Sequence, residues 1–158
     1  MKKHLLLAAL GLSLAACQKD ETDIGPATVE SQFDRDFTLA YRQQVKLPSA
    51  SRPELTITVT DIQSTFCPEN FACLVGTTAT PVLHVKDTQG QTQQVLPARG
   101  KLPYNVNAGG WIDTISVRAN GRRYLLYYVK WRLDANRSQQ DRANKDDFTV
   151  TLRVKKFD

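Results

Sequence analysis

Apolar and polar residues alternate along most of the chain after residue 33, and this alternation predicts strands. The clearest run covers residues 54–62, in which Leu55, Ile57 and Val59 alternate with threonines. Alternating β-branched residues suit a pleated sheet with one buried face and one face toward solvent. The other runs of this kind cover residues 37–47, 82–86, 91–96, 111–119, 122–133 and 148–154. The pattern predicts seven or eight short strands and no long amphipathic helix.

Turn residues lie between these runs and predict two hairpins. Asn120-Gly121 predicts the first, because both residues tolerate a positive φ. The segment 87–90, Asp-Thr-Gln-Gly, predicts the second. Within residues 122–133 we expect one shared face, formed by Leu125, Tyr127, Val129, Trp131 and Leu133. The polar stretch from Asp134 to Asp147 predicts a long loop or a short surface helix.

Short strands separated by turns, without helices, are typical of an all-β domain. We expect residues 33–158 to form an antiparallel β-sandwich of the immunoglobulin-like kind. A small barrel is the alternative, and the sandwich is favoured because nothing in the sequence enforces closure of a barrel. The length of this segment suits a single domain with one hydrophobic core.

The first sixteen residues differ in character from the rest. Lys2 and Lys3 precede an apolar run over residues 5–14, and the small residues Ala15 and Ala16 follow it. This order predicts a secretory signal peptide over residues 1–16. The apolar run is shorter than the roughly 20 residues that a membrane-spanning helix needs.

The order Leu14-Ala15-Ala16-Cys17 resembles the lipobox of bacterial lipoproteins. The resemblance implies cleavage before Cys17, acylation of its thiol and anchoring to a membrane through the attached lipid, for which more than one acyl chain is needed. The stretch that follows, Gln18-Lys19-Asp20-Glu21, resembles the short acidic tether that marks some lipoproteins of Gram-negative bacteria for export to the outer face of the outer membrane. The periplasmic face is the alternative. We expect residues 17–32 to form a flexible tether.

Cys67 and Cys73 remain as a pair once Cys17 is assigned to the lipid. Two thiols in an exported protein indicate a disulfide, which would close a short loop and contribute about 2 to 3 kcal/mol. A redox or metal site is the alternative. Redox pairs are normally separated by two residues, and zinc needs more ligands than two sulfurs and the distant His84.

The segment around these cysteines resembles a group of small secreted or lipid-anchored bacterial domains of unestablished function. In that group an apolar strand leads into Asp-Ser-Arg-Cys-Pro, with Cys-Val-Trp-Ala-Gly shortly after. Cys67, Pro68, Cys73 and Gly76 match this pattern, whereas its Asp-Ser-Arg and Trp are replaced by Ser64, Thr65, Phe66 and Val75. The resemblance implies a β-rich domain with a disulfide-closed loop, and it supplies no catalytic residue.

Charge changes this picture little. Lys and Arg number 21 against 16 Asp and Glu, and two of the lysines belong to the predicted signal. This small surplus predicts no nucleic-acid partner. Arg118, Arg122 and Arg123 form one basic group that we interpret as a solvated face, with weak attraction to anionic glycans or phospholipid headgroups as the alternative.

Residues suited to catalysis are sparse. His84 is the only histidine after residue 16, and the carboxylates lie in or beside predicted turns without a calcium-loop spacing. We therefore expect no enzyme activity, no cofactor and no metal. The aromatic rings of Tyr104, Trp111 and Trp131 are candidates for stacking on a ligand.

These observations predict a lipid-anchored, non-catalytic module of the cell envelope that binds a protein or a glycan through its loops. Two alternatives remain open. The loop between Cys67 and Cys73 could act like that of a protease inhibitor, or converging carboxylates could form an envelope polymer hydrolase.

Overall fold

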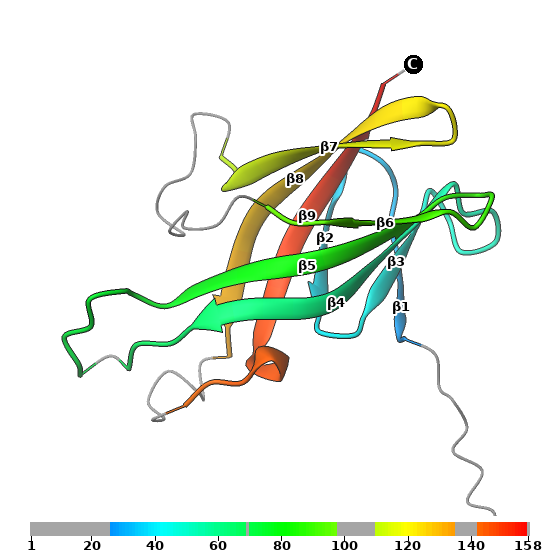
Figure 1. Ribbon diagram of the computed structural model, residues 1–158. Helices are drawn as coiled ribbons and strands as arrows, with labels where there is room; N and C mark the ends of the chain where they lie inside the picture. Colours follow the sequence, from blue (N-terminus) through cyan, green and yellow to red (C-terminus); the bar gives the residue numbers. More distant parts are fainter. Residues whose placement is uncertain (1–25, 69, 98–109, 135–141, 158) are drawn as a thin grey trace, which may run out of the picture.

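The computed structural model describes residues 26–68, 70–97, 110–134 and 142–157, which form two sheets (Figure 1). The first sheet has the order β1-β3-β4-β5-β6 and the second the order β2-β9-β8-β7. The described strands are β1 (Thr28–Glu30), β2 (Asp36–Ala40), β3 (Gln44–Leu47), β4 (Leu55–Thr65), β5 (Thr78–Lys86), β6 (Thr92–Val95), β7 (Asp113–Ala119), β8 (Arg122–Leu133) and β9 (Phe148–Lys156). A short 3-10 turn, η1 (Lys145–Asp147), lies within the polar stretch expected to be a loop or a short helix.

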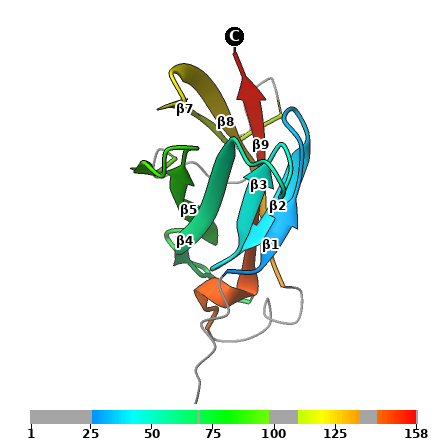
Figure 2. The same cartoon turned by 90° about the vertical axis from the view of Figure 1, so that its right-hand side faces the viewer.

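The two sheets pack as layers around one hydrophobic core, which confirms the predicted β-sandwich (Figures 1 and 2). Ile57 and Val59 from β4 and Leu126 and Tyr128 from β8 are all buried in this core. The sheets are not closed into a barrel, so the barrel alternative is wrong for the described residues.

The start of the domain differs from the prediction in two ways. β1 lies within the segment 17–32 expected to be a tether, and it pairs with β3 in a parallel direction, whereas we expected antiparallel pairing throughout. The run 37–47 is two strands, β2 and β3, which belong to different sheets. The chain turns between them at Arg42, whose φ is 62°. These two differences raise the number of strands above the predicted seven or eight.

The predicted shared face of β8 is wrong for the first part of the strand, and a bulge is the reason. Tyr124, Leu126 and Tyr128 are buried, so the first part of β8 turns the expected residues Leu125 and Tyr127 away from the core. The pairing with β9 shifts register between Tyr128 and Lys130. The extra residue reverses the alternation, and Trp131 and Leu133 then pack against the core.

The hairpin predicted at Asn120-Gly121 is confirmed. The two residues join β7 to β8 with φ values of 52° and 69°, which match the turn that this dipeptide favours. The second predicted hairpin, between β5 and β6, is also present, and its Gly90 has a φ of 81°.

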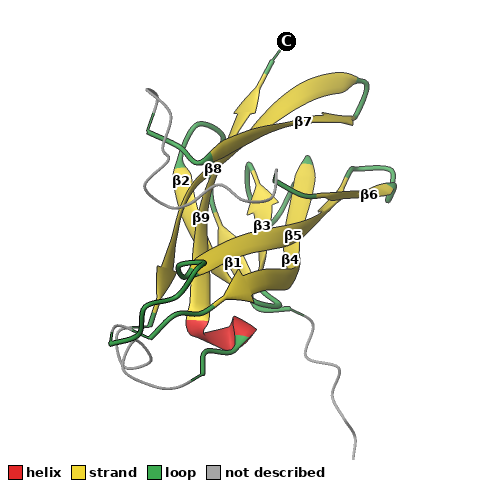
Figure 3. Cartoon of the chain, turned by 60° about the vertical axis from the view of Figure 1, so that its left-hand side comes forward, coloured by secondary structure: helices red, strands yellow, loops and turns green. Residues whose placement is uncertain are grey.

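The connections between neighbouring strands lie at two opposite ends of the sandwich. The connection from β4 to β5 lies at one end, where Thr65 pairs with Thr78. The β5–β6 and β7–β8 turns lie at the other end (Figures 1 and 3). Since β5 has nine residues, the two ends are roughly 30 Å apart.

Candidate binding site

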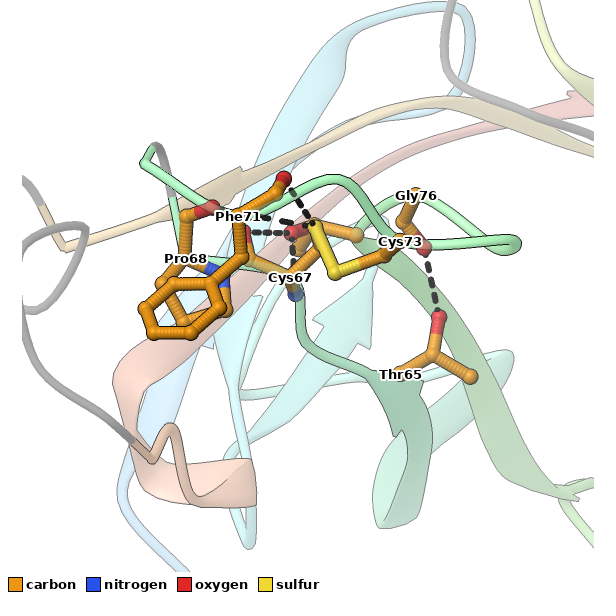
Figure 4. Close-up of a disulfide and its surroundings, with 7 residues drawn as sticks. Thr65, Cys67, Pro68, Phe71, Cys73 and Gly76 are labelled. Atoms are coloured by element: carbon orange, nitrogen blue, oxygen red, sulfur yellow. Dashed lines mark hydrogen bonds between the residues drawn. A yellow bond between two sulfur atoms is a disulfide. The ribbon is translucent and has the colours of Figure 1, made fainter.

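The connection between β4 and β5, residues 66–77, is closed by a disulfide and is called the disulfide loop below. The sulfurs of Cys67 and Cys73 are 2.09 Å apart and the Cα atoms 6.0 Å apart, which confirms the predicted pair (Figure 4). Cys73 lies six positions after Cys67 in the sequence. The crosslink therefore fixes this loop rather than joining distant parts of the fold.

Threonine hydroxyls hold the base of the disulfide loop. Thr65 Oγ1 donates to the carbonyl oxygen of Gly76 at 2.8 Å, and the backbone N–H of Cys67 donates to Thr77 Oγ1 at 3.0 Å. Inside the ring, the N–H of Phe71 donates to the carbonyl oxygen of Pro68 at 3.1 Å and forms a turn. The disulfide and these bonds together restrict the backbone of the loop.

Large apolar side chains gather on the surface of the disulfide loop. The exposed fractions are 64% for Phe71, 107% for Leu74 and 57% for Val75. Within the described residues, Phe157 is the one other exposed large hydrophobic residue, and its exposed fraction is lower, at 38%. Single exposed hydrophobics are normal on a protein surface, whereas a group of them marks an interaction site.

Sequence reasoning reached the disulfide loop but did not single out Phe71, Leu74 and Val75. The available signal was their composition, because three large apolar residues in a short turn-rich segment have no alternating pattern that would bury them. By sequence, residues 66–77 also include no Lys or Arg and one acidic residue, Glu69.

The three predicted aromatic binding residues do not form one platform. Tyr104 lies outside the described residues. Trp111 packs edge-on against Tyr127, with ring centroids 4.8 Å apart, on the face of the second sheet that points away from the core. Trp131 packs against buried Phe148 on the core side, with its Nε1 atom buried. The two tryptophans therefore lie on opposite faces of the sheet.

A polar cluster around Glu54 lies at the end opposite the disulfide loop. Tyr124 donates its hydroxyl hydrogen to Glu54 Oε1, and Lys156 Nζ donates to Glu54 Oε2 at 2.9 Å. Partial burial opposes ionisation of Glu54, but these two bonds outweigh it and hold the pKa of Glu54 below its ordinary value. Burial and the bond to Glu54 raise the pKa of Tyr124 to about 12.

His84 is exposed on β5. In the described part of the chain, no group of three or more His, Cys, Asp or Glu residues could hold a metal ion. Three described surface hollows hold at most one carboxylate each, that of Asp87. The hydrolase alternative needs two converging carboxylates and gains no support from these hollows.

The ranges 26–68, 70–97, 110–134 and 142–157 contain no helix that is long and apolar enough to cross a membrane. Comparison of the chain with protein-family models, curated proteins and solved structures finds no match. The two resemblances described above, to bacterial lipoproteins and to the small disulfide-loop domains, therefore rest on the matching residues and stay predictions.

Proposed function

We propose that the protein is a lipid-anchored, non-catalytic module of the cell envelope that binds a partner protein through the disulfide loop. The observation that carries this proposal is the exposure of Phe71, Leu74 and Val75 on a covalently closed loop. Water contact with these side chains is unfavourable, and a partner that covers them would gain roughly 25 cal/mol per Å² of apolar surface removed from water.

The restricted backbone favours tight binding. A flexible loop loses conformational entropy when it binds, and a loop that is already ordered loses less. The disulfide and the bonds from Thr65 and to Thr77 order this loop before any partner arrives. The same feature is common to loops of protein-binding and inhibitory domains.

The chemistry of the loop favours a protein over a glycan. Leu74 and Val75 are aliphatic and offer no hydrogen bond from their side chains, whereas a glycan needs polar groups as well as a stacking ring. A second candidate is protease inhibition, which the full exposure of Leu74 directly after the crosslinked Cys73 favours. A protease with an apolar specificity pocket would take such a side chain.

The anchor is tested separately from the loop. Cys17→Ala removes the thiol that lipidation needs, so we expect the variant to leave the membrane fraction, and mass spectrometry of the wild type should show an acylated Cys17 as the first residue. Full retention of the variant in membranes would refute the anchor and leave the loop proposal intact.

The loop is tested with Phe71→Ser/Leu74→Ser against Phe157→Ser, an exposed apolar residue outside the loop, as the matched control. A photo-reactive residue placed at position 75 identifies the protein that contacts the loop in envelope extract, and the purified partner is then titrated. We expect at least 10-fold weaker binding for the loop variant and an unchanged dissociation constant for the control. Equal affinity of the wild type, the loop variant and the control for the partner would contradict the proposal.

The wild type and the two variants also distinguish the proposed function from protease inhibition and from glycan binding. Inhibition of an apolar-specific protease by the wild type, lost in the loop variant, would assign the partner as a protease. Loop-dependent binding to purified envelope glycans alone would contradict a protein partner. Because all three substituted side chains are exposed, we expect the free energy of unfolding of both variants to lie within about 0.5 kcal/mol of the wild type.

A further inference from the structure

We propose that a groove at the end opposite the disulfide loop binds a phosphate-bearing ligand. This groove has a volume of about 500 Å³ and lies between the β5–β6 turn and the β7–β8 turn. It is called the arginine groove below, and its lining includes Asp87, Gln89, Gln91, Arg118, Arg122 and Arg123. Volumes of this size hold small molecules in many proteins.

The lining carries an excess of positive charge. It includes three guanidinium groups and one carboxylate, that of Asp87. Asp87 Oδ1 accepts hydrogen bonds from the backbone N–H groups of Gln89 and Gln91, at 2.9 and 2.8 Å, so this carboxylate is used within its own turn. The groove thus presents a cationic surface to solvent.

Glu54 neutralises only a part of this charge. Arg122 lies 4.0 Å from Glu54 Oε1, but both oxygens of Glu54 already accept hydrogen bonds from Tyr124 and Lys156. In the described part of the chain, neither Arg118 nor Arg123 forms an ion pair with this carboxylate. Arg118 and Arg123 are therefore the main cationic groups that could contact a ligand.

Arg118 and Arg123 are direct cross-strand partners in the β7–β8 hairpin. Like charges in this position repel each other and destabilise a hairpin. Arg123 Nε donates to Ser116 Oγ at 2.9 Å, which directs the guanidinium along the outer face of the hairpin without neutralising its charge. Proteins keep such a locally unfavourable arrangement mainly where function requires it, and an anion between the two guanidinium groups would remove the repulsion.

The groove has a fixed shape, because Asn120 joins its two walls. Asn120 Oδ1 accepts hydrogen bonds from the backbone N–H and the hydroxyl of Thr88, at 3.1 and 2.6 Å. Thr88 belongs to the β5–β6 turn, so these bonds hold the two turns at a set distance. A ligand would therefore meet a site that is already arranged.

The residue types favour phosphate over a single carboxylate. Guanidinium groups bind phosphate oxygens through paired, charge-assisted hydrogen bonds. The charges of Arg118 and Arg123 together exceed the single charge of a carboxylate and suit a phosphate that carries up to two. The side-chain amides of Gln89 and Gln91, which line the groove, offer hydrogen bonds to a polar remainder such as a sugar or glycerol. A free sugar phosphate and a phospholipid headgroup share this chemistry.

The test compares three forms of the protein, each carrying Cys17→Ala so that no attached lipid contributes. The groove variant is Arg118→Gln/Arg123→Gln. The matched control is Lys130→Gln/Arg132→Gln, which also removes two positive charges, from exposed residues farther along β8. Binding of glucose 1-phosphate and inorganic pyrophosphate is measured by calorimetry at low ionic strength. Flotation with vesicles of phosphatidylglycerol, against phosphatidylcholine vesicles, tests the headgroup.

We expect the form with Cys17→Ala alone, which has the wild-type groove, to bind at least one phosphate probe. The groove variant should bind this probe at least 10-fold more weakly, and the control variant less than 3-fold more weakly. Binding to the soluble phosphates identifies a free ligand, and groove-dependent flotation with phosphatidylglycerol alone identifies a lipid headgroup. Equal losses in the two variants, or no binding of any probe by the wild type, would overturn the proposal. Neither result would bear on the disulfide loop.

Discussion

Asn120 Nδ2 donates a hydrogen bond to the backbone carbonyl oxygen of Glu54 at 2.8 Å. These residues are far apart in sequence and belong to the turn of one sheet and to the segment that enters β4 of the other. With the two bonds from Thr88, the Asn120 side chain connects three segments at one end of the sandwich. A residue selected by its turn conformation thus also joins the two sheets.

We expect Asn120→Ala to lower the free energy of unfolding by about 2 to 4 kcal/mol. The substitution removes the bonds to Thr88 and Glu54, and it places a side chain that disfavours positive φ at a position with φ of 52°. Asn120→Gly is the matched control, because it loses the same bonds and keeps the turn, so about half of that loss is expected. Urea unfolding measures both. Equal losses would show that the backbone conformation contributes nothing.

We expect Cys67→Ser/Cys73→Ser to lower the free energy of unfolding by about 2 to 3 kcal/mol, since the crosslink restricts the unfolded chain over a short loop. The far-ultraviolet circular dichroism should stay that of a β-sandwich, because neither sulfur is part of the core. Thermal unfolding of the wild type with and without reductant gives an independent measure. A variant as stable as the oxidised wild type would contradict this contribution of the crosslink.

Glu54 should make the stability of the fold depend on acid. Its folded-state pKa lies below its ordinary value of 4.5, so its stabilising contribution is complete above that pH and is lost as the pH falls through the folded-state pKa. We expect Glu54→Gln to flatten the decline of unfolding free energy below about pH 4.5. Asp61, whose pKa the bond from Lys145 lowers, remains in the variant, so the decline should weaken without disappearing. An unchanged slope would contradict this role of Glu54.

Tyr124 should ionise late in an alkaline titration. Its pKa of about 12, above the ordinary 10.0, comes from burial and from the bond to Glu54. Because the folded state favours the neutral phenol, the associated stability is present below pH 10.0 and is lost as the pH rises through about 12. Ultraviolet difference spectra of the wild type and Tyr124→Phe isolate this group. Glu54→Gln should shift its titration to lower pH, and a titration near 10 in the wild type would refute the assignment.

Local patterns were sufficient for much of the fold. The alternation over residues 54–59 and the Asn120-Gly121 turn each depend on neighbours in sequence, and both are found where they were expected. The point at which this alternation ends was not predicted. After Val59 a bulge shifts the register with β5, so that Ile62 is the next buried residue of β4. Bulges in β4 and β8 depend on packing across the sandwich and leave no clear mark in a single sequence.

The candidate sites show the same division. Counting cysteines was enough to predict the Cys67–Cys73 disulfide. The repulsion between Arg118 and Arg123 follows from strand register, but the groove beside them depends on the β5–β6 turn, which is distant in sequence and is held there by Thr88 and Asn120. A sequence lists the charges, whereas the enclosure that gives them a common ligand arises only when separate segments meet.

The parallel pairing of β1 with β3 bears on the exposed edge of the first sheet. Without β1, the outer side of β3 would offer unpaired N–H and C=O groups on which another unfolded chain could add a strand. β1 covers that edge with only three residues, which is too short a template for a growing aggregate. The segment that leads from the predicted anchor thus shortens the sheet edge on which another chain could add a strand.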